Sequence, residues 1–169
     1  GIICSLPCGD EVVGQVAKEY PGIAAEQMPS DALTARFVTH PQTFGVVVGS
    51  KRFGDILTDL GAAIAGSIGI GASANLNPEK KFPSMFEPVH GSAPDIVGKG
   101  IANPLGQVWS GAMMLEHLGM PAAADLVVKA MSSVLASGIK TPDLGGRAKT
   151  AQVTQAGGKE IQPPARQRK

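Results

Sequence analysis

The sequence predicts an α/β protein, in which segments typical of strands alternate with segments typical of helices. The clearest strand pattern is the continuous apolar run FGVVVG at residues 44–49, which is typical of a strand buried on both faces. The clearest helix patterns are two amphipathic stretches, at 108–118 and 122–135. The chain has 169 residues, of which 43% are hydrophobic, which is enough for the core of one ordinary domain.

The segment before the apolar run is expected to form two helices and a short strand. Residues 10–20 carry apolar side chains at helical spacing, and Pro21 and Gly22 end that helix. Residues 23–27 are expected to form the strand. A second helix is expected to begin at Pro29 and to end before Pro41.

The remaining elements follow from the same signals. Residues 53–65 predict a helix, and residues 67–73 and 85–89 predict strands that a polar loop separates. The inward face of this helix is expected to carry Ile56, Leu57, Leu60 and Ile64. Residues 141–146, with the sequence TPDLGG, predict a turn. After Gln155 we expect the helical pattern to give way to a basic tail, disordered over residues 157–169.

Composition argues against several classes of partner. The 15 Lys and Arg residues nearly balance the 14 Asp and Glu residues, and aromatic residues make up only 4% of the chain, so neither feature indicates a nucleic-acid surface. A nucleic-acid arm is the alternative for the basic tail, although a short basic terminus is usually just solvated. The apolar runs fall far short of the ~20 residues that span a bilayer. The first residues lack the basic stretch and cleavage pattern of a signal peptide. We therefore expect a cytoplasmic protein with no nucleic-acid and no membrane partner.

Two carboxylates on the predicted helix after the apolar run are candidate metal ligands. Asp55 and Asp59 are four residues apart, which places them on one helical face, one turn apart. Hard cations such as Mg²⁺ or Mn²⁺ prefer oxygen ligands and take only a few of them from the protein. The alternative is that Asp55 caps the helix and Asp59 is merely solvated. Spacing alone favours the alternative.

A second candidate site follows the predicted strand at 85–89. Its residues Gly91, Ser92 and Ala93 are small enough for the backbone to approach a ligand closely. Asp95, just beyond them, is placed to accept hydrogen bonds from a ribose diol. The G-x-G-x-x-G fingerprint of ordinary dinucleotide sites is absent. Taken alone, His90 fits a structural role as well as a ligand contact, and Asp95 fits a turn cap.

Three long strings resemble the decarboxylating 2-hydroxyacid dehydrogenases of the isocitrate/isopropylmalate dehydrogenase family: FGDILTDLGAAIAGSIGIGASANLNP, FPSMFEPVHGSAPDIVGKGIANPLGQVWSGAMMLEHLG and TPDLGG. The residues of these strings are most similar to those of the tartrate/D-malate branch of the family. The resemblance covers residues 10 to about 155. It implies part of an isopropylmalate-dehydrogenase-like fold with an incomplete sheet, in which the N-terminal half is missing.

The resemblance implies a role for each candidate residue. It assigns a divalent metal, Mg²⁺ or Mn²⁺, to three carboxylates: Asp31, offered across a dimer, with Asp55 and Asp59. It assigns NAD to a second set, in which Asn103 meets the adenine and Glu87 lies near the nicotinamide: Glu87, His90, Gly91, Ser92, Ala93, Asp95 and Asn103. An acid at Asp95 suits a free ribose 2′-hydroxyl and repels a 2′-phosphate, which favours NAD over NADP.

The resemblance also implies a domain organisation. Residues 1–66 would be the remnant of the small domain, which carries the dimer contacts and the metal, and residues 67–156 the C-terminal part of the large cofactor domain. Family members are about twice as long, and no residue here matches their catalytic lysine and tyrosine or their substrate arginines. Lys51 and Arg52 replace an asparagine-leucine pair beside the cofactor, and two cations there would compete for the metal carboxylates.

We therefore expect the C-terminal half of an NAD- and metal-dependent oxidative decarboxylase of a 2-hydroxy acid, of the tartrate, D-malate or 3-isopropylmalate type. The 169 residues alone are expected to be inactive, and to meet the hydroxyacid only when the other half is supplied. A homodimer or a complementing chain is the expected partner. The alternatives are a non-catalytic nucleotide-binding or dimerisation module and a structural remnant.

Overall fold

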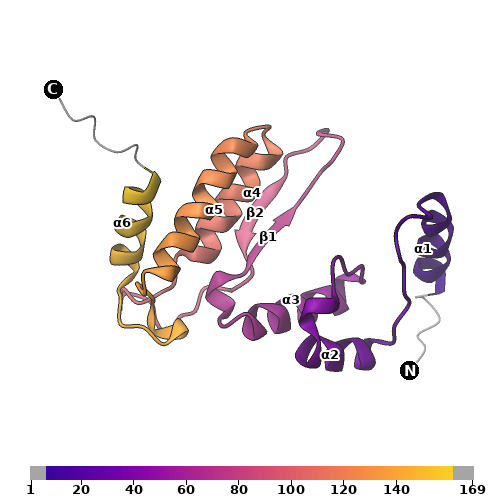
Figure 1. Ribbon diagram of the computed structural model, residues 1–169, viewed down its shortest axis with the longest axis horizontal. Coiled ribbons are helices and arrows are strands. Elements are labelled where there is room, and N and C mark those ends of the chain that lie inside the picture. The colour runs from indigo at the N-terminus through magenta and orange to yellow at the C-terminus, as the bar shows by residue number, and fades with distance from the viewer. Residues whose placement is uncertain (1–6, 162–169) are drawn as a thin grey trace. The chain divides into compact units, whose positions relative to one another are not determined.

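A computed structural model describes residues 7–161 and confirms the α/β class (Figure 1). Its helices and strands are α1 (Pro7–Glu19), α2 (Ser30–Thr39), α3 (Lys51–Ile64), β1 (Ala72–Asn75), β2 (Met85–Pro88), α4 (Leu105–His117), α5 (Pro121–Ala136) and α6 (Thr150–Ile161). Three 3₁₀ turns stand between them, at Pro41–Thr43, Ile68–Ile70 and Pro142–Leu144. The chain divides into two compact units, Gly1–Val46 and Val47–Lys169. The predicted domain boundary after residue 66 refers to the family's domains and stays a prediction.

The first unit consists of helices joined by irregular chain. Helices α1 and α2 confirm the two helices predicted there. The strand predicted at 23–27 is wrong, because this segment is irregular and pairs with no strand among the described residues. Its Ile23 is 69% exposed. A strand is stable only when a neighbouring strand pairs with its backbone N–H and C=O groups. An apolar segment without such a neighbour therefore does not form a strand.

The buried strand predicted at 44–49 is also wrong. The segment has no regular secondary structure, and Val46 and Val48 are 90% and 75% exposed. An apolar run indicates that a segment prefers burial, but burial on both faces needs flanking strands and covering helices. Within the described residues the only sheet is the pair of β1 and β2, which does not include this segment.

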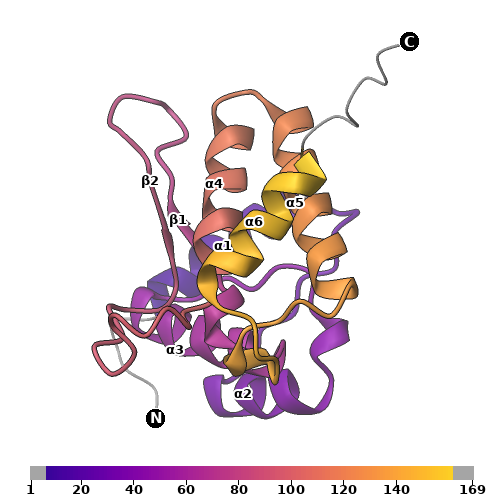
Figure 2. The same cartoon turned by 90° about the vertical axis from the view of Figure 1, so that its left-hand side faces the viewer.

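The second unit is layered in the order hairpin, α4, α5, α6 (Figures 1 and 2). Strands β1 and β2 are antiparallel, with Ala72 opposite Pro88 and Asn75 opposite Met85. The strand predicted at 85–89 is confirmed, whereas residues 68–70 of the segment predicted at 67–73 form a 3₁₀ turn before β1 begins. The helices predicted at 108–118 and 122–135 and the turn at 141–146 are confirmed as α4, α5 and the 3₁₀ turn Pro142–Leu144.

The core lies between the last three helices. Leu105, Val134 and Val153, one from each helix, are at most 4% exposed and pack together. Helix α4 also passes close to the chain before β1. A Cβ atom at Gly106 would lie 2.9 Å from the carbonyl oxygens of both Gly69 and Gly71. Only glycine permits that approach, so Gly106 fixes how closely the helix meets the hairpin.

Helix α3 confirms the helix predicted at 53–65 and begins two residues earlier. Leu57 is buried as expected, but Ile56 and Ile64 are 59% and 37% exposed, so their predicted inward positions are wrong. Ala62, five residues beyond Leu57, is also buried, at 8% exposed.

Helix α6 runs to Ile161, so the expectation that the helix ends after Gln155 is wrong. Residues 157–161 are helical, and the rest of the predicted disordered tail, 162–169, lies outside the described residues.

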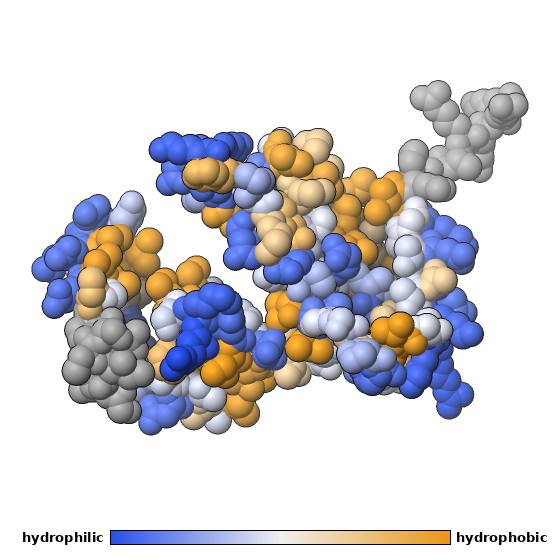
Figure 3. Space-filling view, turned by 180° about the vertical axis from the view of Figure 1, so that it is seen from behind, coloured by the Kyte–Doolittle hydropathy of each residue, from blue (hydrophilic) through white to orange (hydrophobic). Residues whose placement is uncertain are grey.

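Many large apolar side chains are exposed over the described residues, and Figure 3 shows apolar patches between polar ones on one face. No described helix is both long and apolar enough to cross a membrane.

Candidate functional site

The acidic face of α3 is the first part of the site. Asp55 and Asp59 lie one turn apart on this helix, and both are exposed. The N-cap of the helix is Ser50, so the alternative that Asp55 caps it is wrong. Lys51 lies one turn before Asp55, and its Nζ is 2.6 Å from Asp55 Oδ2. Lys51 therefore forms a direct ion pair with one of the two carboxylates, whereas Arg52 makes no ion pair among the described residues, and competition with a metal stays a prediction.

The third predicted metal ligand lies in the other compact unit. Asp31 is in the first turn of α2, and its Oδ1 accepts a hydrogen bond of 2.9 Å from the Ala32 N–H, which satisfies one of the free amides at the helix start. It belongs to the unit that ends at Val46, and Asp55 and Asp59 belong to the unit that begins at Val47. A site shared by the three stays a prediction. Among residues 7–161, no group of three His, Cys, Asp or Glu side chains is arranged to hold a metal ion.

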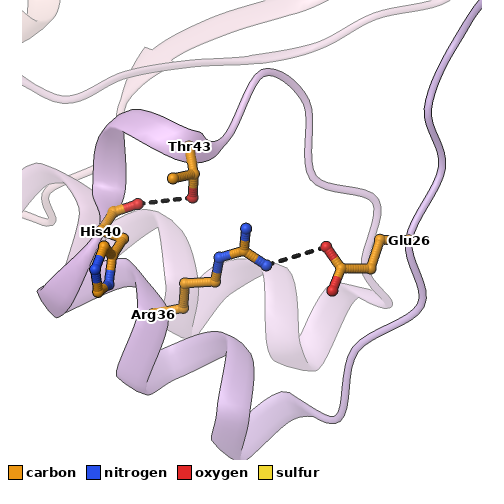
Figure 4. A network of polar contacts seen from close by, with 4 residues as sticks. All are labelled: Glu26, Arg36, His40 and Thr43. Carbon is orange, nitrogen blue, oxygen red and sulfur yellow. Dashed lines mark hydrogen bonds and ion pairs between the residues drawn. The ribbon is translucent and has the colours of Figure 1, made fainter.

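Contacts of Arg36 hold α2 to the chain around it (Figure 4). Its Nη1 lies 3.0 Å from Glu26 Oε2, and its guanidinium lies 5.5 Å from the ring centre of Phe44. Thr43 donates a 2.8 Å hydrogen bond to the His40 carbonyl, which closes the turn after the helix. These contacts tie the last turn of α2 to Glu26 before the helix and to the turn that follows it.

The loop after β2 carries most of the predicted cofactor residues. Gly91, Ser92 and Asp95 are exposed, and His90 Nδ1 lies 2.9 Å from the Gly91 carbonyl oxygen. Ala93 has φ +43°, in the left-handed region that L-residues rarely adopt. Such a conformation costs about 1–2 kcal/mol and concentrates at binding sites. Gly91, Ser92 and the Asp95 carboxylate are thus accessible from solvent on either side of this strained residue.

Glu87 and Asn103 stand on either side of that loop. Glu87 is exposed on β2, opposite Ser73. Asn103 is only 9% exposed, and both ends of its amide are engaged. Its Nδ2 donates to Asp143 Oδ2 at 2.9 Å, and its Oδ1 accepts from the Leu105 N–H at 3.0 Å, which satisfies a free amide at the start of α4.

Asp143 contacts the candidate residue Asn103, and the sequence did not single it out. Its Oδ2 accepts hydrogen bonds from both Ser67 and Asn103, which lie 76 and 40 residues away along the chain. Partial burial acts to raise the pKa of the Asp143 carboxyl, but the side chains of Ser67, Thr141 and Asn103 outweigh it, so its pKa lies below the ordinary value of 3.8. The only sequence signal was the TPDLGG string, which indicated a turn.

The residues present suit the groups that the resemblance implies. Asp55 and Asp59 offer exposed carboxylate oxygens, the donor type that Mg²⁺ and Mn²⁺ prefer, although Lys51 already holds one oxygen. The loop at residues 90–95 combines an accessible backbone with an exposed acid, as a nucleoside ribose requires. Asp55, Asp59 and the loop lie in the second unit, so one folded body carries the acidic helix face and the open loop.

Known proteins match this chain over nearly its whole length. Residues 9–161 match the family model described as isocitrate/isopropylmalate dehydrogenase. A probable tartrate dehydrogenase/decarboxylase of Bacillus subtilis is 53% identical over 154 residues, which cover 91% of this chain and 44% of that protein. A decarboxylating D-malate dehydrogenase of Escherichia coli is 53% identical over 161 residues, which cover 92% of this chain and 45% of that protein.

Solved structures also match this chain. The crystal structure of isocitrate dehydrogenase from Methylococcus capsulatus matches with a TM-score of 0.85 and 42% identity, over 90% of this chain and 45% of that one. The chain thus spans less than half the length of the relatives it matches. Since the family match extends over most of the sequence, the chain belongs to the isocitrate/isopropylmalate dehydrogenase family.

Proposed function

We propose that these residues are the metal- and cofactor-binding half of an NAD-dependent oxidative decarboxylase of a 2-hydroxy acid, of the tartrate, D-malate or 3-isopropylmalate type. The observation that carries the proposal is the pair Asp55 and Asp59, exposed one turn apart on α3 in the same compact unit as the open loop at 90–95. The names of the relatives, a tartrate dehydrogenase/decarboxylase and a decarboxylating D-malate dehydrogenase, support the reaction class.

In this proposal each residue binds or orients. Asp55 and Asp59, with Asp31 of a second copy or a complementing chain, hold Mg²⁺ or Mn²⁺ through carboxylate oxygens. Asp95 accepts hydrogen bonds from the ribose hydroxyls, Asn103 meets the adenine, and the small residues of the loop let its backbone approach the cofactor. When bound, the two groups supply a Lewis acid at the substrate hydroxyl and a hydride acceptor.

We further propose that residues 1–169 do not turn over substrate by themselves. No residue here matches the family's catalytic lysine and tyrosine or the arginines that hold substrate carboxylates. Catalysis by positioned groups depends on all of them being in place, so a half-site binds without reacting. The partner in this proposal is a second copy, in a homodimer, or a complementing chain that supplies the other residues.

Complementation with a relative tests this function. The 169-residue chain is purified alone, and also co-expressed with the part of the Bacillus subtilis relative that it does not cover. Both preparations are assayed with Mn²⁺, NAD and a panel of D-malate, tartrate, isocitrate and 3-isopropylmalate, by the absorbance of reduced nicotinamide. We expect turnover only in the complemented preparation, and its loss when Asp55 and Asp59 are both changed to Ala. Turnover by the chain alone would refute the proposed dependence on other residues.

A second candidate is a non-catalytic nucleotide-binding or dimerisation module. The Lys51–Asp55 ion pair favours it, because an ammonium already neutralises one of the carboxylates that a cation needs. The same preparations separate the two functions. A complemented enzyme that binds NAD but shows neither turnover nor Mn²⁺ binding would establish the module and refute the decarboxylase.

A further inference from the structure

The side chain of Asn103 belongs to a hydrogen-bond network, centred on Asp143, that joins three segments far apart in the sequence. Asp143, in the 3₁₀ turn Pro142–Leu144, accepts the Asn103 Nδ2–H at 2.9 Å through its Oδ2. The same oxygen accepts a hydrogen bond from Ser67. The Ser67 hydroxyl in turn accepts the Gly69 N–H at 2.9 Å. One carboxylate oxygen thus joins the chain before β1, the segment before α4 and the turn after α5.

The space around this carboxylate is closed to larger groups. A Cβ atom at position 69 would lie 2.8 Å from Asn103 Cβ and 2.9 Å from Asp143 Oδ2. Gly69 therefore lets the backbone press against both side chains at once. With Leu105 N–H on its Oδ1, the Asn103 amide has one orientation that satisfies both neighbours, since a flipped amide would place its N–H₂ against the Leu105 donor.

From these contacts we infer that Asp143 is a positioning residue of the cofactor site, which acts through Asn103. Charge-assisted hydrogen bonds are about twice as strong as neutral ones, so the carboxylate fixes the amide more firmly than a neutral acceptor would. Each Asn103 polar atom uses one of the two hydrogen bonds it can make, which leaves a second N–H and a second lone pair for a ligand. The role rests on the proposed function, in which Asn103 meets the adenine ring.

The test measures binding of adenosine diphosphate to the 169-residue chain by titration calorimetry, with Trp109 fluorescence as a second signal. Asp143→Ala is expected to weaken binding about tenfold. Asp143→Asn keeps an oxygen acceptor without the charge, so its affinity is expected to lie between that of the unmodified chain and that of Asp143→Ala. Asp125→Ala is the matched control, because Asp125 is exposed on α5 away from these contacts, and its affinity should equal that of the unmodified chain.

A double-mutant cycle separates positioning from general loosening of the fold. In an Asn103→Ala background, Asp143→Asn is expected to cause no further loss of affinity, because the residue through which it acts is gone. Losses that add independently would overturn the inference, as would equal affinity of the Asp143→Asn chain and the unmodified chain. If Asp143→Ala does not fold, the affinities in the cycle of Asp143→Asn and Asn103→Ala are enough to test the inference.

A readout without ligand distinguishes failure of this inference from failure of the proposed function. Hydrogen exchange of the Leu105 N–H is expected to speed up in Asp143→Ala, because a loosened Asn103 no longer accepts it steadily. Unchanged exchange would overturn the positioning role. An unmodified chain that binds no adenosine diphosphate would overturn the proposed cofactor site, and with it the role of Asp143 in binding.

Discussion

Lys51 Nζ lies 2.6 Å from Asp55 Oδ2, on consecutive turns of α3, so the helix supplies its own cation to the carboxylate proposed to bind a metal. Both side chains are largely exposed, at 86% and 66%. Exposed pairs of this kind contribute only about 0.2–1 kcal/mol. The ion pair is therefore a weak competitor that a divalent cation can displace at a modest cost in affinity.

Replacing Lys51 by Gln is expected to strengthen Mn²⁺ binding about two- to fivefold, since the cation no longer displaces an ammonium. The gain should shrink as salt concentration rises, because salt screens exposed charges. Titration calorimetry with Mn²⁺ at low and high salt measures both effects. Arg52→Gln is the control: it removes the same charge from the same helix turn but breaks no ion pair, and an equal gain there would show that the Lys51–Asp55 contact is irrelevant.

Two glycines of α4 are expected to respond in opposite ways to alanine. Gly111→Ala should stabilise the chain by about 0.5–1 kcal/mol, because alanine is the better helix former and its Cβ would meet nothing within 4 Å. Gly106→Ala should destabilise it, because its Cβ would lie 2.9 Å from two backbone oxygens that cannot move aside independently. Urea denaturation of both variants checks the signs. A stabilised Gly106→Ala chain would contradict the close packing of α4 on the segment before β1.

Sequence patterns predicted helices α1 to α5 but missed α6 beyond Gln155, and two of the four predicted strands are wrong; the difference has a physical reason. A helix satisfies its hydrogen bonds within itself, so the apolar spacing and the Pro and Gly stops around α1, α2 and α5 were sufficient. A strand depends on its partners, and the apolar residues 44–49 have none among the described residues. The antiparallel pair of β1 and β2 formed where two strand-like segments are joined by a loop.

The residues of the candidate site likewise divide into those that sequence spacing predicts and those that only the folded chain brings together. Asp55 and Asp59 were placed correctly on one helical face, because they are four residues apart and helical geometry does the rest, whereas the helix was predicted to begin only after Lys51. Asp143 was not recognised, because its partners Ser67 and Asn103 are brought to it only by the packing of three distant segments. A turn motif gives no indication of which carboxylate oxygen accepts which donor.

Leu105 carries much of the core and should be costly to truncate. It is 4% exposed and packs with Val134 and Val153 between α4, α5 and α6. Leu105→Ala is expected to lower the free energy of unfolding by about 2–5 kcal/mol, since it removes buried methyl groups and leaves a cavity. Leu126→Ala, at a 45% exposed position of α5, should change it by less than about 0.5 kcal/mol. Similar losses in the two variants, measured by urea denaturation, would contradict the described core.

Stability should fall in acid partly because of Asp143. Its pKa in the folded chain lies below the ordinary value of 3.8, since hydrogen bonds from Ser67 and Asn103 outweigh the effect of partial burial. The folded state then binds fewer protons than the unfolded state at low pH, so this contribution is present above about pH 3.8 and is lost as pH falls through the folded pKa. Comparing the free energy of unfolding of the unmodified chain and Asp143→Asn between pH 6 and pH 3 should therefore show a difference that narrows toward pH 3. Ser67→Ala removes one donor and should reproduce part of that change, whereas parallel pH profiles of the unmodified chain and Asp143→Asn would rule out a charged Asp143 as a stabilising group.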